Sequence, residues 1–391
     1  MNAALLLQNL AAYSLQLLLI VAVGAALPAI FRLRSPRARL FYWQTLLLCC
    51  LALPALEPWR VPADGRGGEV TIAVSGTPLA SGAKTPQPLS PASWALWLLA
   101  AGWAARTGWL GLGLFRLQRY RTRAVPLDAA LIALREMSLR LGVWPDLYVS
   151  EDVQGPVTFG AIFPAVIFPR RFLSMNEDAQ RSIVCHEFLH IRRRDWPFTI
   201  AEEFIRCGFW FHPAVWWMLS RIQLSREQAV DHAAVLCIAD RAQYLETLLD
   251  AAAVRAGLDP ALAPLFLRKR HLSRRVASLL KETPMSKRRL VSSLVPIAAL
   301  ALFAVRLSVL LFPLSVPAQE VASGPGVTVD LGPYKLLHGS PAVYPEAARD
   351  RKIEGAVQLE ANVDDQGAVT DARVLGGPTE LRKEALEAVL S

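Results

Sequence analysis

The chain has 391 residues, 53% of them hydrophobic, and a formal net charge of +9. With a mean hydropathy of +0.31, this composition excludes an ordinary soluble multidomain protein and predicts membrane spans. Much of the basic excess flanks apolar stretches, which favours membrane lipid as a partner, and we expect no direct contact with nucleic acid.

Four apolar stretches are near the roughly 20 residues that a helix needs to cross the hydrocarbon core. The second is the shortest of them, and Pro54 lies inside it. The four predicted transmembrane helices are residues 1–31, 40–57, 94–115 and 290–315.

Clusters of Arg and Lys flank the first, third and fourth predicted helices, and the positive-inside rule assigns these clusters to the cytoplasm. The loop 32–39 and the region 116–289 are therefore predicted to be cytoplasmic. The Gly/Pro/Ser-rich loop 58–93 and the chain after residue 315 are predicted to lie outside.

The cytoplasmic region begins with a helical pattern at 128–143, for which Gly142 is a plausible end. Two strand patterns follow, DLYVS at 146–150 and PVTFGAIFPAVIFP at 156–169. The second pattern is either a core strand or a substrate-binding edge, and its candidate substrate contacts are Thr158, Phe159, Gly160 and Ala161.

The next segment contains HEFLH. Ser174 and Glu177 have the spacing of a capping box, which predicts a helix from there to about residue 194. On that helix His186 and His190 lie one turn apart on one face, as two imidazoles must to share a tetrahedral zinc ion. Glu187 is placed to take a proton from water. The alternative is a pair of solvated histidines beside a structural glutamate.

A third ligand must come from downstream. The metzincin pattern is excluded, because Arg193 and Trp196 stand where it requires Gly and His. A predicted helix after Pro213 carries Glu227 and Asp231 one turn apart, so a carboxylate there could complete the site while Asp231 orients a ligand histidine. His232 remains a rival ligand. Cys185 adjoins His186, and a buried small side chain is favoured over a fourth ligand.

Several motifs together resemble the BlaR/MecR-type membrane metallopeptidases over residues 1–315: HEFLH, the aspartate of RRRDW, FHPAVWW, REQAVD and HLSRRVASLL. The resemblance implies a cytoplasmic α+β zincin-type domain at 116–289 and a Zn²⁺ ion held by His186, His190 and Glu227. It implies Glu187 as the catalytic acid and base, with Asp231 and Asp195 in support. His212 stands where the family usually has Asn, which predicts packing or capping.

The resemblance also implies a function. It predicts a zinc metalloendopeptidase of the bacterial inner membrane that couples an external signal to proteolysis of a cytoplasmic protein, with a winged-helix repressor as the candidate substrate. A homodimer is left open.

Residues 316–333 are predicted to be a flexible linker. Beyond them, 334–391 combines a hairpin pattern around Asp365-Gln366-Gly367 with a helix at 380–390. YPEAAR and the VDDQG turn are similar to the C-terminal domain of TonB-type proteins, which implies a small periplasmic α+β domain that binds a ligand or protein. That domain normally continues into a last strand, so a truncated domain is expected.

The predicted fold is therefore a membrane bundle of four helices with a cytoplasmic α+β zincin-type domain and a periplasmic TonB-like domain. The alternative function is a TonB-like energy transducer or binding protein carried on a relict peptidase. A linker of about 17 residues extends to at most ~60 Å. TonB proteins use a long Pro-rich spacer to reach outer-membrane receptors, so the short linker argues against an energy transducer.

Overall fold

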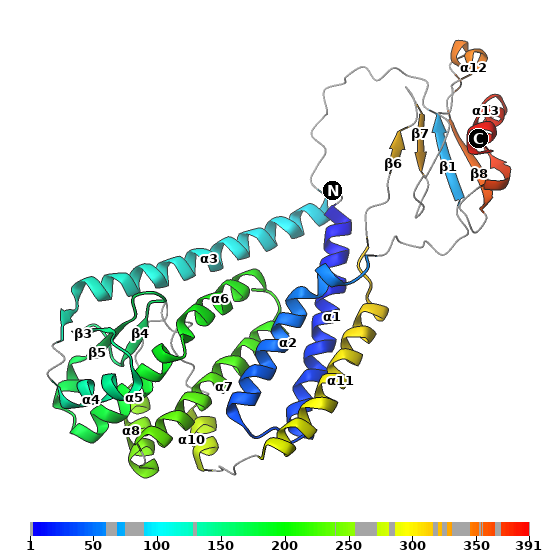
Figure 1. The fold of residues 1–391 in the computed structure, drawn as a ribbon. Helices are drawn as coiled ribbons and strands as arrows, with labels where there is room; N and C mark the ends of the chain where they lie inside the picture. The colour runs from blue at the N-terminus through cyan, green and yellow to red at the C-terminus, as the bar shows by residue number, and fades with distance from the viewer. Residues whose placement is uncertain are drawn as a thin grey trace. The chain divides into compact units, whose positions relative to one another are not determined.

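The computed structural model describes residues 3–59, 69–74, 90–127, 131–238, 240–254, 272–280, 286–315, 320–322, 327–330, 345–351, 353, 355–363 and 369–390. It is mostly helical, with a mixed α+β region and a small C-terminal β/α domain (Figure 1). The chain divides into two compact units. One comprises Ser14–Ala55 and Ala95–Ser308, and the other Met1–Tyr13, Leu56–Trp94 and Val309–Ser391.

Three helices of the described chain are long and apolar enough to cross a membrane: α1 (Ala3–Ile30), α2 (Pro36–Leu56) and α11 (Lys287–Leu311). They correspond to the first, second and fourth predicted spans. Tyr42 of α2 donates a hydrogen bond to the Gly24 carbonyl of α1 at 2.7 Å. A Cβ on Gly24 would lie 2.7 Å from Leu46, so glycine allows α1 and α2 to approach closely.

The third predicted span lies within α3 (Pro91–Arg123), a continuous helix of 33 residues. It is not one of the three candidate membrane helices found in the described chain. Arg106 and several tryptophans lower its hydropathy below that of a simple apolar span. The structure therefore supports three of the four predicted spans, and the span at 94–115 stays a prediction.

The mixed region contains a four-stranded sheet in the order β2-β3-β5-β4. Its strands are β2 (Val125–Pro126), β3 (Asp146–Ser150), β4 (Val157–Phe159) and β5 (Ala165–Pro169). The pair β3 and β5 is parallel, and β4 joins β5 antiparallel, which makes β4 an edge strand. The two strand patterns are confirmed, with the second divided into β4 and β5.

Helices pack on this sheet around one apolar core, which joins α4 (Ile132–Leu141), β5, α5 (Glu177–Arg192) and α7 (Pro213–Ile238). As predicted, α4 ends at Gly142, whose φ of 67° is left-handed. The core side chains include Leu134, Met137, Phe168, Phe172, Val184, Phe188 and Val230.

The start of α5 differs from the prediction. Asn176 is the N-cap, and its side chain accepts a hydrogen bond from the Ala179 amide at 2.7 Å. Ser174 instead belongs to the 3-10 helix η1 (Arg170–Ser174), and its hydroxyl donates to the Arg171 carbonyl. The predicted Ser174–Glu177 capping box is therefore wrong, because η1 already engages that hydroxyl.

One helix, α6, and the turn after it connect α5 to α7. Arg194, at a left-handed φ of 55°, separates α5 from α6 (Asp195–Gly208). His212 then caps α7: its Nδ1 accepts a hydrogen bond from the Val215 amide at 3.4 Å. The predicted capping role of His212 is confirmed. The unit is completed by α8 (Arg241–Val254) and α10 (Leu272–Leu280).

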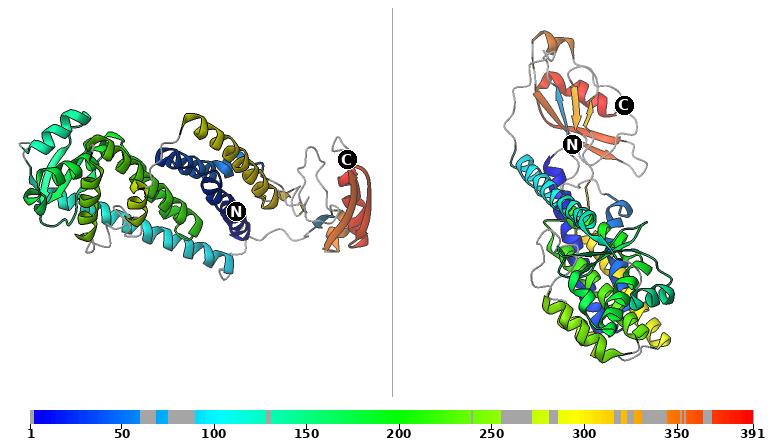
Figure 2. Two further views of the ribbon diagram at one scale, coloured as in Figure 1. Left: turned by 90° about the horizontal axis from the view of Figure 1, so that it is seen from below. Right: turned by 90° about the vertical axis from the view of Figure 1, so that its left-hand side faces the viewer.

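The other unit holds an antiparallel sheet in the order β6-β7-β1-β8-β9, with α13 (Thr379–Leu390) packed on it (Figures 1 and 2). The predicted hairpin is β8 (Gly355–Val363) with β9 (Val369–Gly376), and its turn lies outside the described residues. The short helix α12 (Glu346–Asp350) contributes Ala348 to the core.

The middle strand of this sheet comes from an unexpected part of the chain. The loop predicted at 58–93 supplies β1 (Glu69–Val74), which pairs with β7 (Val327–Asp330) on one side and β8 on the other. Strands β6 (Glu320–Ala322) and β7 lie in the segment predicted as a flexible linker. Short runs rich in valine and threonine explain why these segments form strands.

Candidate metal centre

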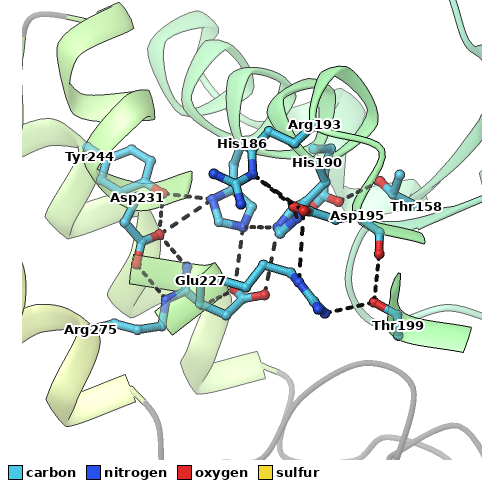
Figure 3. A network of polar contacts seen from close by, with 12 residues as sticks. Thr158, His186, His190, Arg193, Asp195, Thr199, Glu227, Asp231, Tyr244 and Arg275 are labelled. Carbon is cyan, nitrogen blue, oxygen red and sulfur yellow. Dashed lines mark hydrogen bonds and ion pairs between the residues drawn. The ribbon is translucent and has the colours of Figure 1, made fainter. Parts of the chain in front are cut away.

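Helices α5 and α7 bring three potential metal ligands together. His186 and His190 lie on α5 and Glu227 on α7, with one ligand atom of each within 4.8 Å of the others (Figure 3). The two Nε2 atoms are 3.2 Å apart. Each Nε2 also lies 3.7 Å from one Glu227 oxygen. The three side chains that the sequence assigned to zinc therefore meet at one point.

Neighbouring side chains fix the orientation of both imidazoles. His190 Nδ1 lies 2.9 Å from Asp195 Oδ2, and His186 Nδ1 lies 2.8 Å from the Tyr244 hydroxyl. That hydroxyl donates its proton to Asp231 at 2.7 Å, so it must accept the Nδ1 proton of His186. Both Nε2 atoms are then left with a lone pair facing Glu227.

This arrangement fits a divalent cation. Two imidazole lone pairs and a buried carboxylate converge on one point, and these are donor atoms that bind zinc in proteins. Bonds of about 2.0–2.1 Å to a tetrahedral zinc ion would separate the ligand atoms by about 3.3–3.4 Å. The two Nε2 atoms, 3.2 Å apart, are close to that value, and each lies 3.7 Å from a different oxygen of Glu227, Oε2 for His186 and Oε1 for His190.

Buried charge keeps the ligand carboxylate ionised. Burial alone would raise the pKa of Glu227, but Arg275 and the two histidines outweigh it and hold that pKa well below its ordinary value. Burial likewise acts to raise the pKa of Asp195, and the hydrogen bond with His190 together with nearby arginines lowers it overall. The pKa of Tyr244 is raised well above normal by burial and by Asp231, so its hydroxyl keeps its proton.

Arg275 of α10 connects the two carboxylates of α7. Its Nε and Nη2 donate to Asp231 at 2.8 and 2.6 Å, and its Nη1 lies 3.1 Å from Glu227 Oε2. Sequence reasoning named Asp231 and Asp195 but missed Tyr244 and Arg275. The HLSRR segment pointed to the region of Arg275, whereas no local pattern marks Tyr244.

Glu187 faces a cavity of about 500 Å³ that both histidines and Glu227 also line. Its carboxylate accepts a hydrogen bond from the hydroxyl of Thr158 on β4 at 2.6 Å. Among the four candidate substrate contacts, Thr158, Gly160 and Ala161 line the cavity. Phe159 instead points into the core, where its ring packs edge-on against Trp196, because successive residues of a strand face opposite sides.

The rival ligands do not join the cluster. His232 is not a member of the metal-binding group found in the described chain. Cys185 is fully buried among apolar side chains, as predicted for a small hydrophobic residue.

A helix with the HExxH pattern, completed by a glutamate from a later helix, defines a metallopeptidase-type centre. The chain belongs to the BlaR1 peptidase M56 family, whose model matches residues 74–279. A second family model, described as "Gram-negative bacterial TonB protein C-terminal", matches residues 340–391. The chain is also similar to the regulatory protein BlaR1 of Bacillus licheniformis, 28% identical over 94 residues, which cover 24% of this chain and 16% of that relative.

Proposed function

We propose that this membrane protein is a zinc metalloendopeptidase that couples an external signal to cleavage of a cytoplasmic protein. The observation that carries the proposal is the convergence of His186, His190 and Glu227 beside Glu187 in one cavity. Membership of a peptidase family supports the reaction class.

In the proposed mechanism His186, His190 and Glu227 hold zinc. Zinc bound there would lower the pKa of water toward ~7 and polarise a peptide carbonyl. Glu187 accepts the proton of the attacking water and returns it to the leaving amine. Asp195 and Tyr244 keep the imidazoles in the ligating orientation, and Arg275 keeps Glu227 in place.

The substrate would bind as an extended peptide along β4. This strand is at the edge of its sheet, and its Thr158 contacts the proposed base. Main-chain pairing with an edge strand exposes the peptide carbonyl to the centre. Gly160, at a φ of 96°, ends β4, and a Cβ there would lie 2.2 Å from the Phe163 carbonyl oxygen. Glycine therefore shapes the end of the proposed substrate groove.

The signalling role is proposed from the family and the topology. The regulatory protein named among the relatives supports a regulatory target, and a winged-helix repressor is the candidate. We place the peptidase in the cytoplasm and the TonB-like domain in the periplasm of a bacterial inner membrane. Strand β1 follows α2, and its partners β7 and β8 follow α11. Their pairing supports the placement of both segments on the same side of the membrane. A homodimer and a periplasmic ligand belong to the same proposal.

The test is elemental analysis of the detergent-purified full chain. We expect one zinc per chain in the wild type and in Glu187→Ala, and loss of zinc in Glu227→Gln and His190→Ala. Peptidase activity should be absent from all three variants. A wild-type chain without zinc would overturn the proposal.

In that case the alternative is a binding or energy-transducing role for the C-terminal domain. The match of residues 340–391 to the TonB C-terminal description favours it. It predicts that zinc-free protein still responds to a periplasmic partner.

A further inference from the structure

Helix α6 has its polar and apolar faces reversed relative to a helix in water. Phe198 and Phe204 are 52% and 56% exposed, whereas Glu202, Glu203 and Arg206 are 7%, 4% and 4% exposed. A surface helix of a soluble domain buries its apolar face and exposes its charges. The outer face of α6 is therefore suited to an apolar solvent.

The inward charges of α6 are compensated within the protein. Arg206 pairs with Glu203, and Arg226 of α7 pairs with Glu202. Arg106 of α3 lies 5.0 Å above the ring of Trp216, with Arg206 at 5.5 Å from the same ring. Ionisable groups at membrane depth face the protein interior and pair in this way.

The turn between α6 and α7 reaches the middle of a candidate membrane helix. His212 Nε2 donates a hydrogen bond to the Ser14 carbonyl of α1 at 3.1 Å. Ser14 is about 16 Å from the start of α1, which at 1.5 Å per residue is about 42 Å long. Trp217 of α7 also packs edge-on against Trp43 of α2, with ring centroids 5.5 Å apart.

The same turn contacts α3. Trp210 Nε1 donates to the Leu99 carbonyl at 3.1 Å, and a Cβ on Gly102 would lie 2.2 Å from the Trp210 ring. A glycine on α3 therefore makes room for the turn beside this helix.

Several backbone groups of the turn have hydrogen-bond partners within the protein. The Phe209 amide donates to the Ile205 carbonyl at 2.9 Å, and Trp216 Nε1 donates to the Phe209 carbonyl at 3.1 Å. His212 caps the start of α7. Irregular backbone at membrane depth requires such partners, because hydrocarbon offers none.

We propose that α6 and the first turns of α7 form a re-entrant hairpin that enters the bilayer from the side of the metal centre and turns near its midplane. Lipid acyl chains cover the outer face of α6, which carries Phe198 and Phe204. The proposal depends on the membrane assignment of α1 and α2 but not on peptidase activity.

The hairpin sets the depth of the metal centre. Asp195 begins α6, about 20 Å along the helix from the turn, and the half-thickness of the hydrocarbon core is about 15 Å. Since Asp195 holds His190, the centre lies at the membrane surface. Its protein substrate must present the cleaved bond close to the lipid headgroups.

The test uses the full-length chain in lipid nanodiscs, whose two faces are both open to reagents. Phe204→Cys is compared with the matched control Leu139→Cys, because Leu139 is an exposed apolar residue of α4, at 66%. A membrane-impermeant maleimide should label Leu139→Cys above the background of the five native cysteines. It should fail to label Phe204→Cys until the sample is dissolved in SDS. Labelling of Phe204→Cys in the intact nanodisc would overturn the proposal.

A second measurement separates lipid from protein as the cover of α6. Benzoylphenylalanine in place of Phe204 is irradiated in native membranes, and the adducts are identified by mass spectrometry. Lipid adducts support the hairpin. Crosslinks to a second copy of the chain, or to another protein, without lipid adducts would show that a partner covers this face and would overturn it. A zinc content equal to that of wild type confirms that each variant is folded.

Discussion

Helices α5 and α6 follow one another in the chain and have opposite surfaces. α5 buries Val184 and Phe188 and exposes Glu177 and Asp178, as expected next to water. α6 exposes phenylalanine and buries glutamate and arginine. The face that a helix buries therefore indicates what kind of solvent its other face meets.

The largest effect is expected on peptidase activity, from replacing Glu187, the residue of α5 that faces the cavity. Glu187→Gln keeps the size of the side chain but cannot accept a proton, so peptidase activity should fall by roughly 10²- to 10⁴-fold. Zinc content should stay at the wild-type value. Retained activity would exclude Glu187 as the base and make its contact with Thr158 structural.

Arginines on the two helices provide a direct comparison of stability. Arg206→Met on α6 leaves the buried Glu203 without its closest partner and should destabilise the fold by about 3–5 kcal/mol. Arg181→Met on α5 removes partly exposed ion pairs to Glu136, Glu177 and Asp178, worth about 0–1 kcal/mol. Thermal unfolding in the same nanodiscs measures both. Equal losses would contradict the reversed burial of α6.

The contact where α5 meets α6 should control metal affinity. Asp195→Asn weakens the anchor of His190 and should lower zinc affinity by roughly 10- to 100-fold in a chelator competition assay.

This variant should also shift the pH dependence of zinc binding. Burial acts to lower the pKa of His190, but the hydrogen bond to Asp195 and the nearby carboxylates raise it overall. A proton therefore competes with zinc below that raised pKa, and zinc affinity should increase as the pH rises through it. Because the mutation removes one of the raising charges, the midpoint should move to lower pH. An unchanged midpoint would show that Asp195 does not set the basicity of His190.

Two glycines of α3 test the packing of the proposed hairpin. Gly102→Ala places a methyl group against the Trp210 ring and should cost about 1–3 kcal/mol in thermal unfolding. Gly108→Ala is the control, because no atom lies within 4 Å of its Cβ position, and it should be neutral or stabilising by up to about 1 kcal/mol. A harmless Gly102→Ala would argue against close packing between α3 and the turn.

Local periodicity was sufficient to predict the helix of His186 and His190, since one turn of helix brings them to the same face. The pattern at 156–169 also predicted strand structure, but it left open whether the strand lay in the core or at an edge, which only the order of the strands in the sheet decides. Tyr244 and Arg275 were not predicted, because only tertiary packing brings α8 and α10 to the histidines. The proximity of Arg106 to Glu203 could not be predicted either, because Arg106 lies on α3 and Glu203 on α6, and only tertiary packing brings them together.

The strand β1 has a consequence for biosynthesis. Its Val70 pairs with Leu359, about 290 residues later in the chain. At a synthesis rate of about 5–20 residues per second, β1 leaves the ribosome roughly 15 to 60 s before its partner β8 is made. During that interval its backbone groups are unpaired and open to strands of other chains. The C-terminal sheet is therefore expected to be the last part of the molecule to fold, and the growing chain to need protection from aggregation until then.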